Sequence, residues 1–90
     1  MKINLRQIEV FRAVMLTGSI SAAAKLLYVS QPAISRLLSH TEQRLGFALF
    51  RRTKGRLYPT PEARRMLAEV NSVYEGIERV NEIAEDLAAN

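Results

Sequence analysis

The chain has 90 residues, of which 48% are hydrophobic, so it can form one small folded domain, with or without an appendage, and is too apolar for a disordered chain. It contains no cysteine, which excludes a disulfide framework and a thiolate metal site, and it has no apolar run of membrane-spanning length. Its formal net charge is +4, and charges interrupt the first stretch, MKINLRQIEVF, too early for the core of a signal peptide.

Two helices are predicted at the start of the chain. The first runs from Asn4, a favourable N-cap residue, to Thr17, and Gln7 stands three residues after the cap, as a capping box requires. The second covers residues 20–27, ISAAAKLL, behind Ser19 as its cap. Its three adjacent alanines leave room for another helix to approach closely, and we interpret the first helix as scaffold.

The next predicted helix, residues 31–45, has an apolar side and an outward face that is small, polar and basic. Ser30 is the expected cap, Pro32 lies in the first turn, where its missing N–H costs nothing, and Gly46 is the expected stop. Tyr28, in the turn before this helix, is expected to pack. The apolar side carries Ile34, Leu37, Leu38 and Leu45. The outward side carries Pro32, Arg36, Ser39 and Gln43.

A short two-stranded hairpin is predicted after this helix. In the segment FALFRRTKGRLYPTP, apolar residues stand on both sides of a basic tip formed by residues 51–56. Gly55 permits the positive φ that a tight turn needs. The apolar positions are Leu49, Phe50, Leu57 and Tyr58.

The last predicted helix runs from Pro61 to Ala88 behind Thr60 as its cap. Its apolar residues keep a heptad spacing through four heptads: Ala63, Met66, Val70, Val73, Ile77, Val80, Ala84 and Leu87. A single helix cannot bury such a stripe, so a second surface must cover these residues, which are the ones that a dimer would use. Leu67 and Tyr74 flank the stripe and are expected to dock on the first domain. The alternative is a helix packed wholly on its own domain, which offers little surface for a helix of about 40 Å.

Charge is divided unevenly along the chain. Residues 1–61 contain ten Lys and Arg against two acids, a net charge of +8, whereas residues 62–90 contain three Arg against seven acids, a net charge of −4. A basic first part predicts a polyanionic partner, with nucleic acid favoured over a membrane surface. Charges that served only for solvation would not explain this segregation.

Two helices joined by a short turn and followed by a basic hairpin are typical of a winged helix-turn-helix. An α-helix fits the major groove, where Gln31 can pair with adenine and Arg36 with guanine, and hairpin arginines suit phosphates and a narrow minor groove. We therefore predict a mainly α fold of three helices and a two-stranded β wing, with a long helix behind it. Residues 1–60 form the expected DNA-binding domain and residues 61–90 the linker or dimerisation helix.

The run AAAKLLYVSQPAISRLLSHTEQRLGFALFRR resembles the N-terminal domain of LysR-type transcriptional regulators. The family pattern is AA-x-x-L-x-x-SQPA-[IV]-S-x-x-[IL]-x-x-[LF]-E-x-x-LG-x-x-LF-x-R, and with its wing and long helix it covers nearly the whole chain. The matching residues are Ala23, Ala24, Leu27, Ser30, Gln31, Pro32, Ala33, Ser35, Glu42, Leu45, Gly46, Leu49, Phe50 and Arg52.

The resemblance implies a bacterial, cytoplasmic, sequence-specific domain for double-stranded DNA with a dyad-symmetric operator. It also implies a homodimer through the long helix, with a tetramer as a further state of the full-length protein. Family members continue into a domain that binds a small effector, so a chain ending at Asn90 is expected to be a fragment that senses no ligand. The residues predicted to bind DNA, from their chemistry and from the resemblance, are Ser30, Gln31, Pro32, Ser35, Arg36, Ser39, Arg52, Thr53 and Lys54.

Some positions depart from the family pattern. Arg51 stands where the family often has Glu, which adds charge at the wing. Thr41 stands where Leu or Phe is commoner and is expected to loosen the core at this helix.

The wing residue Arg52 also has an alternative role, a structural salt bridge to an acid such as Glu42.

Enzyme chemistry has no support in the sequence. It offers no nucleophile with a paired base, no metal-ligand cluster and no glycine-rich phosphate loop before a helix, so no cofactor is expected. Two other functions stay open. One is a helical protein-interaction module whose long helix pairs with a different protein, and the other is a winged helix of another regulator family.

Overall fold

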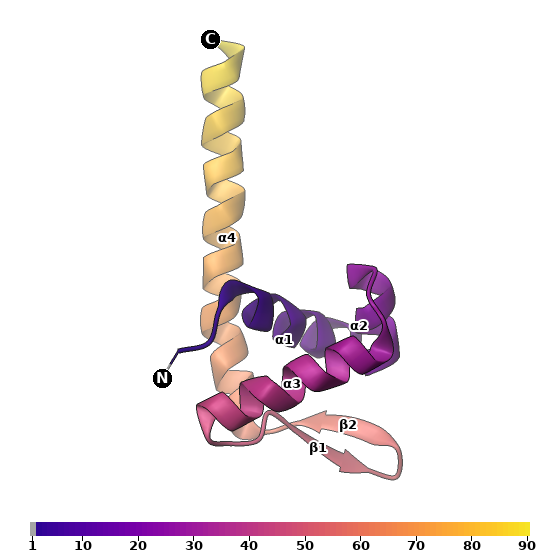
Figure 1. Cartoon of the computed structure of the whole chain (residues 1–90). Coiled ribbons are helices and arrows are strands. Elements are labelled where there is room, and N and C mark those ends of the chain that lie inside the picture. Colours follow the sequence, from indigo (N-terminus) through magenta and orange to yellow (C-terminus); the bar gives the residue numbers. More distant parts are fainter. Residues whose placement is uncertain (1) are drawn as a thin grey trace.

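The computed structural model describes residues 2–90. Helices α1, α2 and α3 form a three-helix body, a β-hairpin lies alongside α3, and α4 extends away from the body as an arm (Figure 1). The described part of the chain is elongated, with extents of 54 × 26 × 20 Å. The elements are α1 (Leu5–Thr17), α2 (Ile20–Leu27), α3 (Gln31–Leu45), β1 (Phe50–Thr53), β2 (Arg56–Pro59) and α4 (Pro61–Ala89).

Each helix begins at the cap that the sequence predicts. The side chain of Asn4 accepts a hydrogen bond from the Gln7 N–H at 2.9 Å, and the Gln7 side chain accepts one from the Asn4 N–H at 2.8 Å, which completes the capping box of α1. The other caps each accept a bond from the N–H three residues later, and they are Ser19, Ser30 and Thr60. The predicted starts of the helices are therefore confirmed, and α4 ends one residue beyond its predicted end.

The core consists of two clusters of buried apolar side chains. Ala23 and Ala24 of α2 are buried, so α2 packs closely on its neighbours, as the small side chains predict. This first cluster contains Val10, Ala13, Val14, Ala23, Ala24, Ile34 and Leu38. The second cluster joins α1 to the start of α4 and contains Phe11, Leu49, Ala63 and Val70.

Thr41 is part of the closed interior of α3. Its side chain is fully buried, and its hydroxyl donates to the carbonyl oxygen of Leu37 at 2.7 Å. The polar atom is therefore satisfied within the helix, and Thr41 is accommodated in the buried interior.

A set of hydrogen bonds ties both ends of the hairpin to the body. One carboxylate oxygen of Glu42 accepts from the N–H groups of Leu49 and Phe50, at 2.6 and 3.2 Å. The buried hydroxyl of Thr60 donates to the carbonyl oxygen of Ala48 at 2.9 Å. The backbone N–H of Thr60 donates to the carbonyl oxygen of Leu49, also at 2.9 Å. The start of β1 and the start of α4 are thus fixed to each other and to α3.

The apolar stripe of α4 divides into two parts. Ala63 and Val70 are buried and Met66 is half-buried, because they pack in the second cluster with Phe11 and Leu49. Ala63 and Val70 therefore belong to the chain's own core, which corrects their assignment to a dimerisation surface. Leu67 and Tyr74 pack on the same cluster, as expected. The stripe residues left exposed on the arm are Val73, Ile77, Val80, Ala84 and Leu87.

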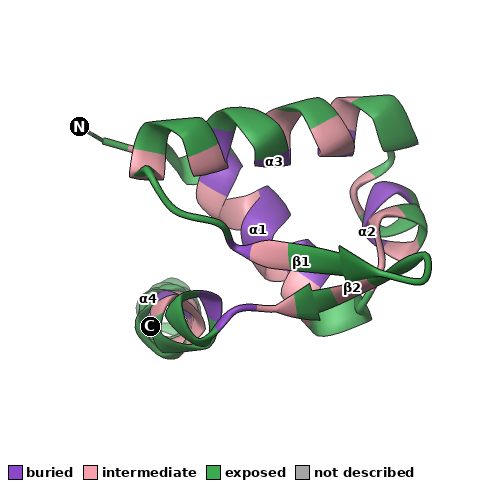
Figure 2. Ribbon diagram, turned by 90° about the horizontal axis from the view of Figure 1, so that it is seen from below, coloured by how far each residue is buried: buried purple, intermediate pink, exposed green. Residues whose placement is uncertain are grey.

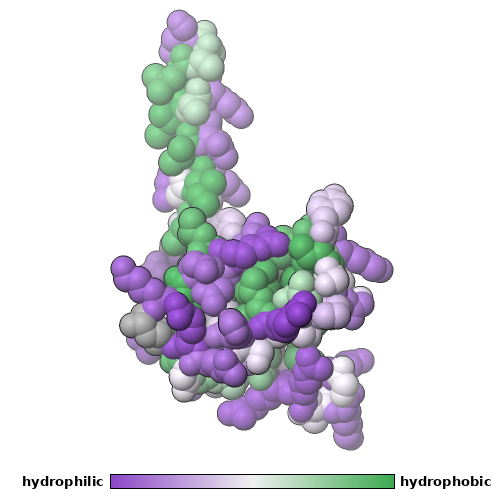
Figure 3. All heavy atoms as spheres, viewed as in Figure 1, coloured by the Kyte–Doolittle hydropathy of each residue, from purple (hydrophilic) through white to green (hydrophobic). Residues whose placement is uncertain are grey.

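The exposed part of the stripe is continuous along the arm. Figure 3 shows apolar residues running up α4 beyond the body, with hydrophilic residues beside them. Packing within the chain continues to Tyr74, well past the domain boundary predicted at residue 60. Across residues 2–90, no helix combines the length and the apolar character that crossing a bilayer requires.

We predict that Glu42→Ala lowers the free energy of unfolding by about 2 kcal/mol, because two N–H groups lose a charged acceptor. Urea unfolding at neutral pH and fixed chain concentration measures this change. Glu42→Gln keeps an acceptor oxygen and is expected to lose about half as much. A loss below about 0.5 kcal/mol for Glu42→Ala would contradict the role assigned to this carboxylate.

Candidate nucleic-acid interface

The outward face of α3 is polar and open to solvent. Ile34 and Leu38 are buried on the inner side of the helix, and Figure 2 shows exposed residues along its outer side. Ser35 is half-buried at the edge of this face. The predicted DNA-binding residues that are exposed on α3 are Gln31, Pro32, Arg36 and Ser39.

The hairpin turns through two residues, Lys54 and Gly55, both with positive φ, at 51° and 75°. Two successive positive φ values are typical of the tight turns whose twist matches paired strands. The basic tip is therefore shorter than the predicted segment 51–56, since Arg51 and Arg52 lie in β1 and Arg56 lies in β2.

The strand register determines which arginine faces α3. Arg52 pairs with Leu57, and cross-strand partners share one face of the sheet. Leu57 packs against the core cluster of the three-helix body. Arg52 therefore lies on the sheet face turned toward α3, whereas its neighbour Arg51 lies on the opposite face.

A hollow of about 620 Å³, here called the α3–hairpin groove, lies between α3, the hairpin and the start of α2. It brings together three of the predicted residues, Gln31, Ser35 and Arg52, from two elements. A second hollow of about 330 Å³ continues from it, and Ser35, Ser39 and Arg52 line that one. Ser35 and Arg52 thus lie where the two hollows meet.

The groove also contains residues that the predicted site did not include. Ser21 comes from the first turn of α2, and Arg56 and Tyr58 come from β2. The helix-turn-helix arrangement could have indicated Ser21, because it brings the start of α2 beside α3. The basic character of Arg56 was visible in the sequence, and it lines the groove although it alternates with Leu57 along β2.

The other predicted residues lie outside the groove. Arg36 lies on the opposite flank of α3, where it lines a separate hollow of about 410 Å³ with Arg6 and His40. Thr53 and Lys54 are exposed at the end of the hairpin. Ser30 is exposed, and its side chain caps α3. Pro32 lies in the first turn of that helix.

Arg52 is free of the salt bridge considered as its alternative role. Arg6 and Glu9 form the one ion pair found within residues 2–90. Glu42 uses its carboxylate for the backbone of Leu49 and Phe50 instead. The guanidinium of Arg52 is thus left available at the edge of the groove.

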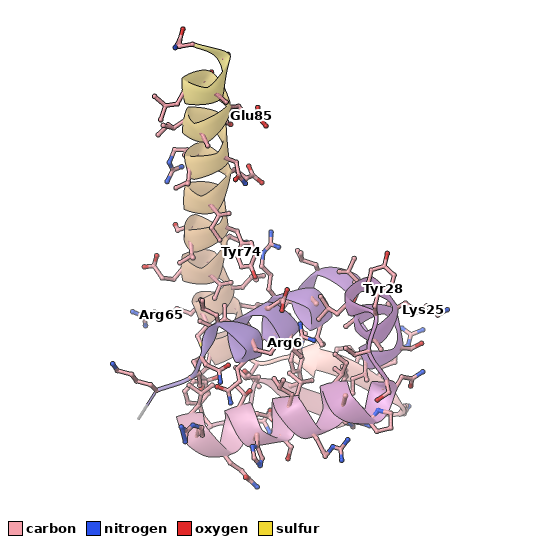
Figure 4. The ribbon with its side chains drawn as sticks, turned by 45° about the horizontal axis from the view of Figure 1, so that its top comes forward. Arg6, Lys25, Tyr28, Arg65, Tyr74 and Glu85 are labelled. Carbon is pink, nitrogen blue, oxygen red and sulfur yellow. The ribbon has the colours of Figure 1, made fainter. Side chains whose placement is uncertain are left out.

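Tyr28 does not pack as expected. It adopts a left-handed conformation, with φ of 58°, and 95% of its surface is exposed. Figure 4 shows Tyr28 and Lys25 directed outward at the same end of the body. The phenol extends from the turn between α2 and α3 into solvent.

The described chain, from Lys2 to Asn90, holds no group of three or more His, Asp or Glu side chains placed to bind a metal ion. The side chains that line the α3–hairpin groove carry hydroxyl, amide and guanidinium groups together with apolar carbon. These groups suit a polyanion that presents oxygen acceptors.

Comparisons with known proteins agree on one family. The family described as bacterial regulatory helix-turn-helix proteins, lysR family, matches residues 5–64. The transcriptional regulator DgcR of Pseudoalteromonas is 51% identical over 84 residues, which are 93% of this chain and 29% of that protein. The transcriptional activator protein LysR of Escherichia coli is 46% identical over 85 residues, 94% of this chain and 27% of that protein. The chain therefore spans less than a third of these relatives.

Two similar solved structures are complexes with DNA. A complex of the BenM DBD with catB site 1 DNA matches with a TM-score of 0.85 and 25% identity, over 98% of this chain and 99% of that chain. A complex of the CbnR DBD with DNA matches with a TM-score of 0.79 and 31% identity, over 96% and 99%. The similarity includes both the body and the long helix, since nearly all of each chain is covered.

We predict that Lys54→Asn raises the free energy of unfolding by about 0.5 kcal/mol, because Asn tolerates the left-handed conformation better than Lys. Thermal unfolding at low salt measures the change. Gly55→Ala is the matched control with the opposite expected sign. It should lower the free energy of unfolding by about 1 kcal/mol, because alanine disfavours the positive φ of this position. A destabilised Lys54→Asn protein would contradict the turn geometry described above.

Proposed function

The chain belongs to the LysR family of bacterial regulatory helix-turn-helix proteins, and on that basis we propose that it binds double-stranded DNA with sequence preference as part of a transcriptional regulator. The single observation that carries the proposal is the juxtaposition of the outward face of α3 with the basic hairpin across one groove. Two structural neighbours that cover nearly the same length are DNA complexes, which supports it.

In this proposal α3 enters the major groove. A groove about 12 Å wide admits one helix, and the first residues of that helix reach the base edges. Gln31 and Arg36 carry the planar amide and guanidinium that pair with adenine and guanine. They lie on different flanks of α3, so they would contact different base pairs.

The α3–hairpin groove then accommodates the phosphate backbone beside the major groove. Ser35 and Arg52 are close enough to line the same hollows, and Arg56 adds a second guanidinium from β2. A hydroxyl and two guanidinium groups are strong donors to phosphate oxygens. Lys54, at the tip of the hairpin, would contact the neighbouring backbone or the minor groove.

The exposed part of the α4 stripe is proposed to pair with the same stripe of a second copy. A two-fold interface brings identical patches together, so one apolar stripe serves both partners. The acids of residues 62–90 lie on this arm, away from the basic body, so repulsion from phosphate does not oppose binding. Two bodies held this way would read a dyad-symmetric site.

Residues 1–60 are proposed as the part that reads DNA, and residues 61–90 as the helix whose exposed part pairs. Such a regulator acts in the cytoplasm, where bacterial DNA lies, and it acts by binding rather than by catalysis. We propose that any response to a small effector belongs to the additional length that the relatives possess.

The test begins with a selection from random duplexes at physiological salt. We expect recovered sequences to share a motif with two-fold symmetry, whose half-site spacing reports the geometry of the pair. Binding without a motif that disappears as salt rises would contradict sequence-specific recognition, because phosphate attraction alone has that salt dependence.

On the selected duplex, Arg36→Ala should weaken binding by about 1–3 kcal/mol, because a bidentate contact to a base is lost. Fluorescence anisotropy measures the change. Arg65→Ala removes the same charge from an exposed position on α4 and is the matched control, with little expected effect. Equal losses for both variants would mean that Arg36 contributes only long-range charge.

Ile77→Lys should dissociate the pair, because it puts a charge in the middle of the exposed stripe. We expect the dissociation constant to rise by about 100-fold or more, as measured by analytical ultracentrifugation. Ser72→Lys adds the same charge on the same helix at an exposed position that faces away from the stripe, and should leave the pair intact. A wild-type chain that stays monomeric and pairs only with a different protein would favour the protein-interaction alternative.

A further inference from the structure

Arg12 connects the body to the arm by two directional contacts. Its Nε donates to the side-chain oxygen of Asn71 at 3.2 Å, and its guanidinium carbon lies 4.0 Å from the centroid of the Tyr74 ring. All three residues are half-buried. Figure 4 shows Tyr74 at the level where α4 leaves the body. We call this arrangement the Arg12 clamp.

The clamp lies at the last point of support for the arm. Tyr74 is the most C-terminal residue of α4 that packs on a core cluster within the described chain. Residues 77–90 are all exposed. The direction of the free arm is therefore determined by what holds α4 at and before Tyr74.

The nature of the contacts singles out Arg12. The apolar contacts of Ala63 and Val70 are non-directional, so they hold α4 on the body without fixing its tilt strongly. A guanidinium that stacks on a ring and donates to an amide fixes both distance and orientation. Over residues 2–90 Arg12 has no carboxylate partner, so an ion pair does not account for its position.

The free arm acts as a lever. From Tyr74 to Ala89 an α-helix extends about 22 Å, so a tilt of about 10° at the clamp moves the end of the arm by about 4 Å. One base pair along DNA is about 3.4 Å. A small change in tilt therefore shifts the two bodies of a pair by a base pair or more relative to each other.

We infer that Arg12 is a positioning residue that fixes the direction of α4 and, through it, the half-site spacing that the pair accepts. The inference rests on the proposed function, since spacing has meaning only for a paired DNA-binding protein. Arg12 itself lies on α1 and is not assigned to the DNA contacts.

The first experiment needs no DNA. The chain has no native cysteine, so Lys25→Cys and Glu85→Cys put one spin label on the body and one on the arm. Both positions are exposed, and Figure 4 shows both. Pulsed electron spin resonance, with excess unlabelled chain, then measures the distance distribution within one protomer.

In this background, Arg12→Lys keeps the charge but loses the planar fork, and Tyr74→Leu keeps apolar packing but loses the ring. Both should broaden the distribution about twofold, because the directional contact is lost. Arg65→Lys makes the same chemical change at an exposed arginine of α4 and should match wild type. Unchanged widths in folded Arg12→Lys and Tyr74→Leu would overturn the inference. Circular dichroism checks folding, and either variant alone suffices if the other fails to fold.

The second experiment uses the selected duplex with its spacer altered by one or two base pairs. Wild type should lose about tenfold in affinity for a two-base-pair change, whereas the clamp variants should lose less than about threefold. Affinity for a duplex with a single half-site should not change. Variants that keep the wild-type spacing preference would overturn the inference and leave DNA binding intact. If wild type selects no duplex, the proposed function fails, and the spin-label distances still test the clamp.

Discussion

The carboxylate of Glu42 accepts both N–H groups at the start of the hairpin, and the positions of the hairpin and the arm depend on that contact. Leu49, held there, is fully buried between α1 and α4. Its carbonyl oxygen accepts from Thr60, which caps α4. One charged side chain on α3 therefore links the orientation of the hairpin to the point where the arm begins. Arg52 of the hairpin lies at the groove beside α3 because of this link.

The local features were predictable because each depends on residues a few positions apart. Asn4 with Gln7, and Ser19, Ser30 and Thr60, could be assigned as caps from adjacent sequence, and α3 could be recognised from its amphipathic pattern. The heptad stripe was also visible. The division of this stripe into a buried and an exposed part was not visible, because the heptad spacing is the same at Ala63 and at Leu87. Only tertiary packing against Phe11 covers the part of the stripe nearest the body.

The features that sequence reasoning missed depend on distant contacts or on unfavourable local conformations. Arg12 and Asn71 are 59 positions apart, and neither carries a motif that predicts their hydrogen bond. Lys54 and Tyr28 adopt left-handed conformations that non-glycine residues rarely take, so a longer tip and a packed tyrosine were expected. For the candidate interface, the residue types were predictable, but the meeting of Ser35 on α3 with Arg52 on the hairpin was not, because it depends on tertiary packing.

The free length of α4 has a consequence for how the protein responds to its own abundance. Residues 77–90 are all exposed in the described chain, and an isolated helix of this length is only marginally stable in water. If two arms pair as proposed, ordering of this segment and association become one cooperative event. Occupancy of a two-fold site would then rise with the square of chain concentration at low abundance.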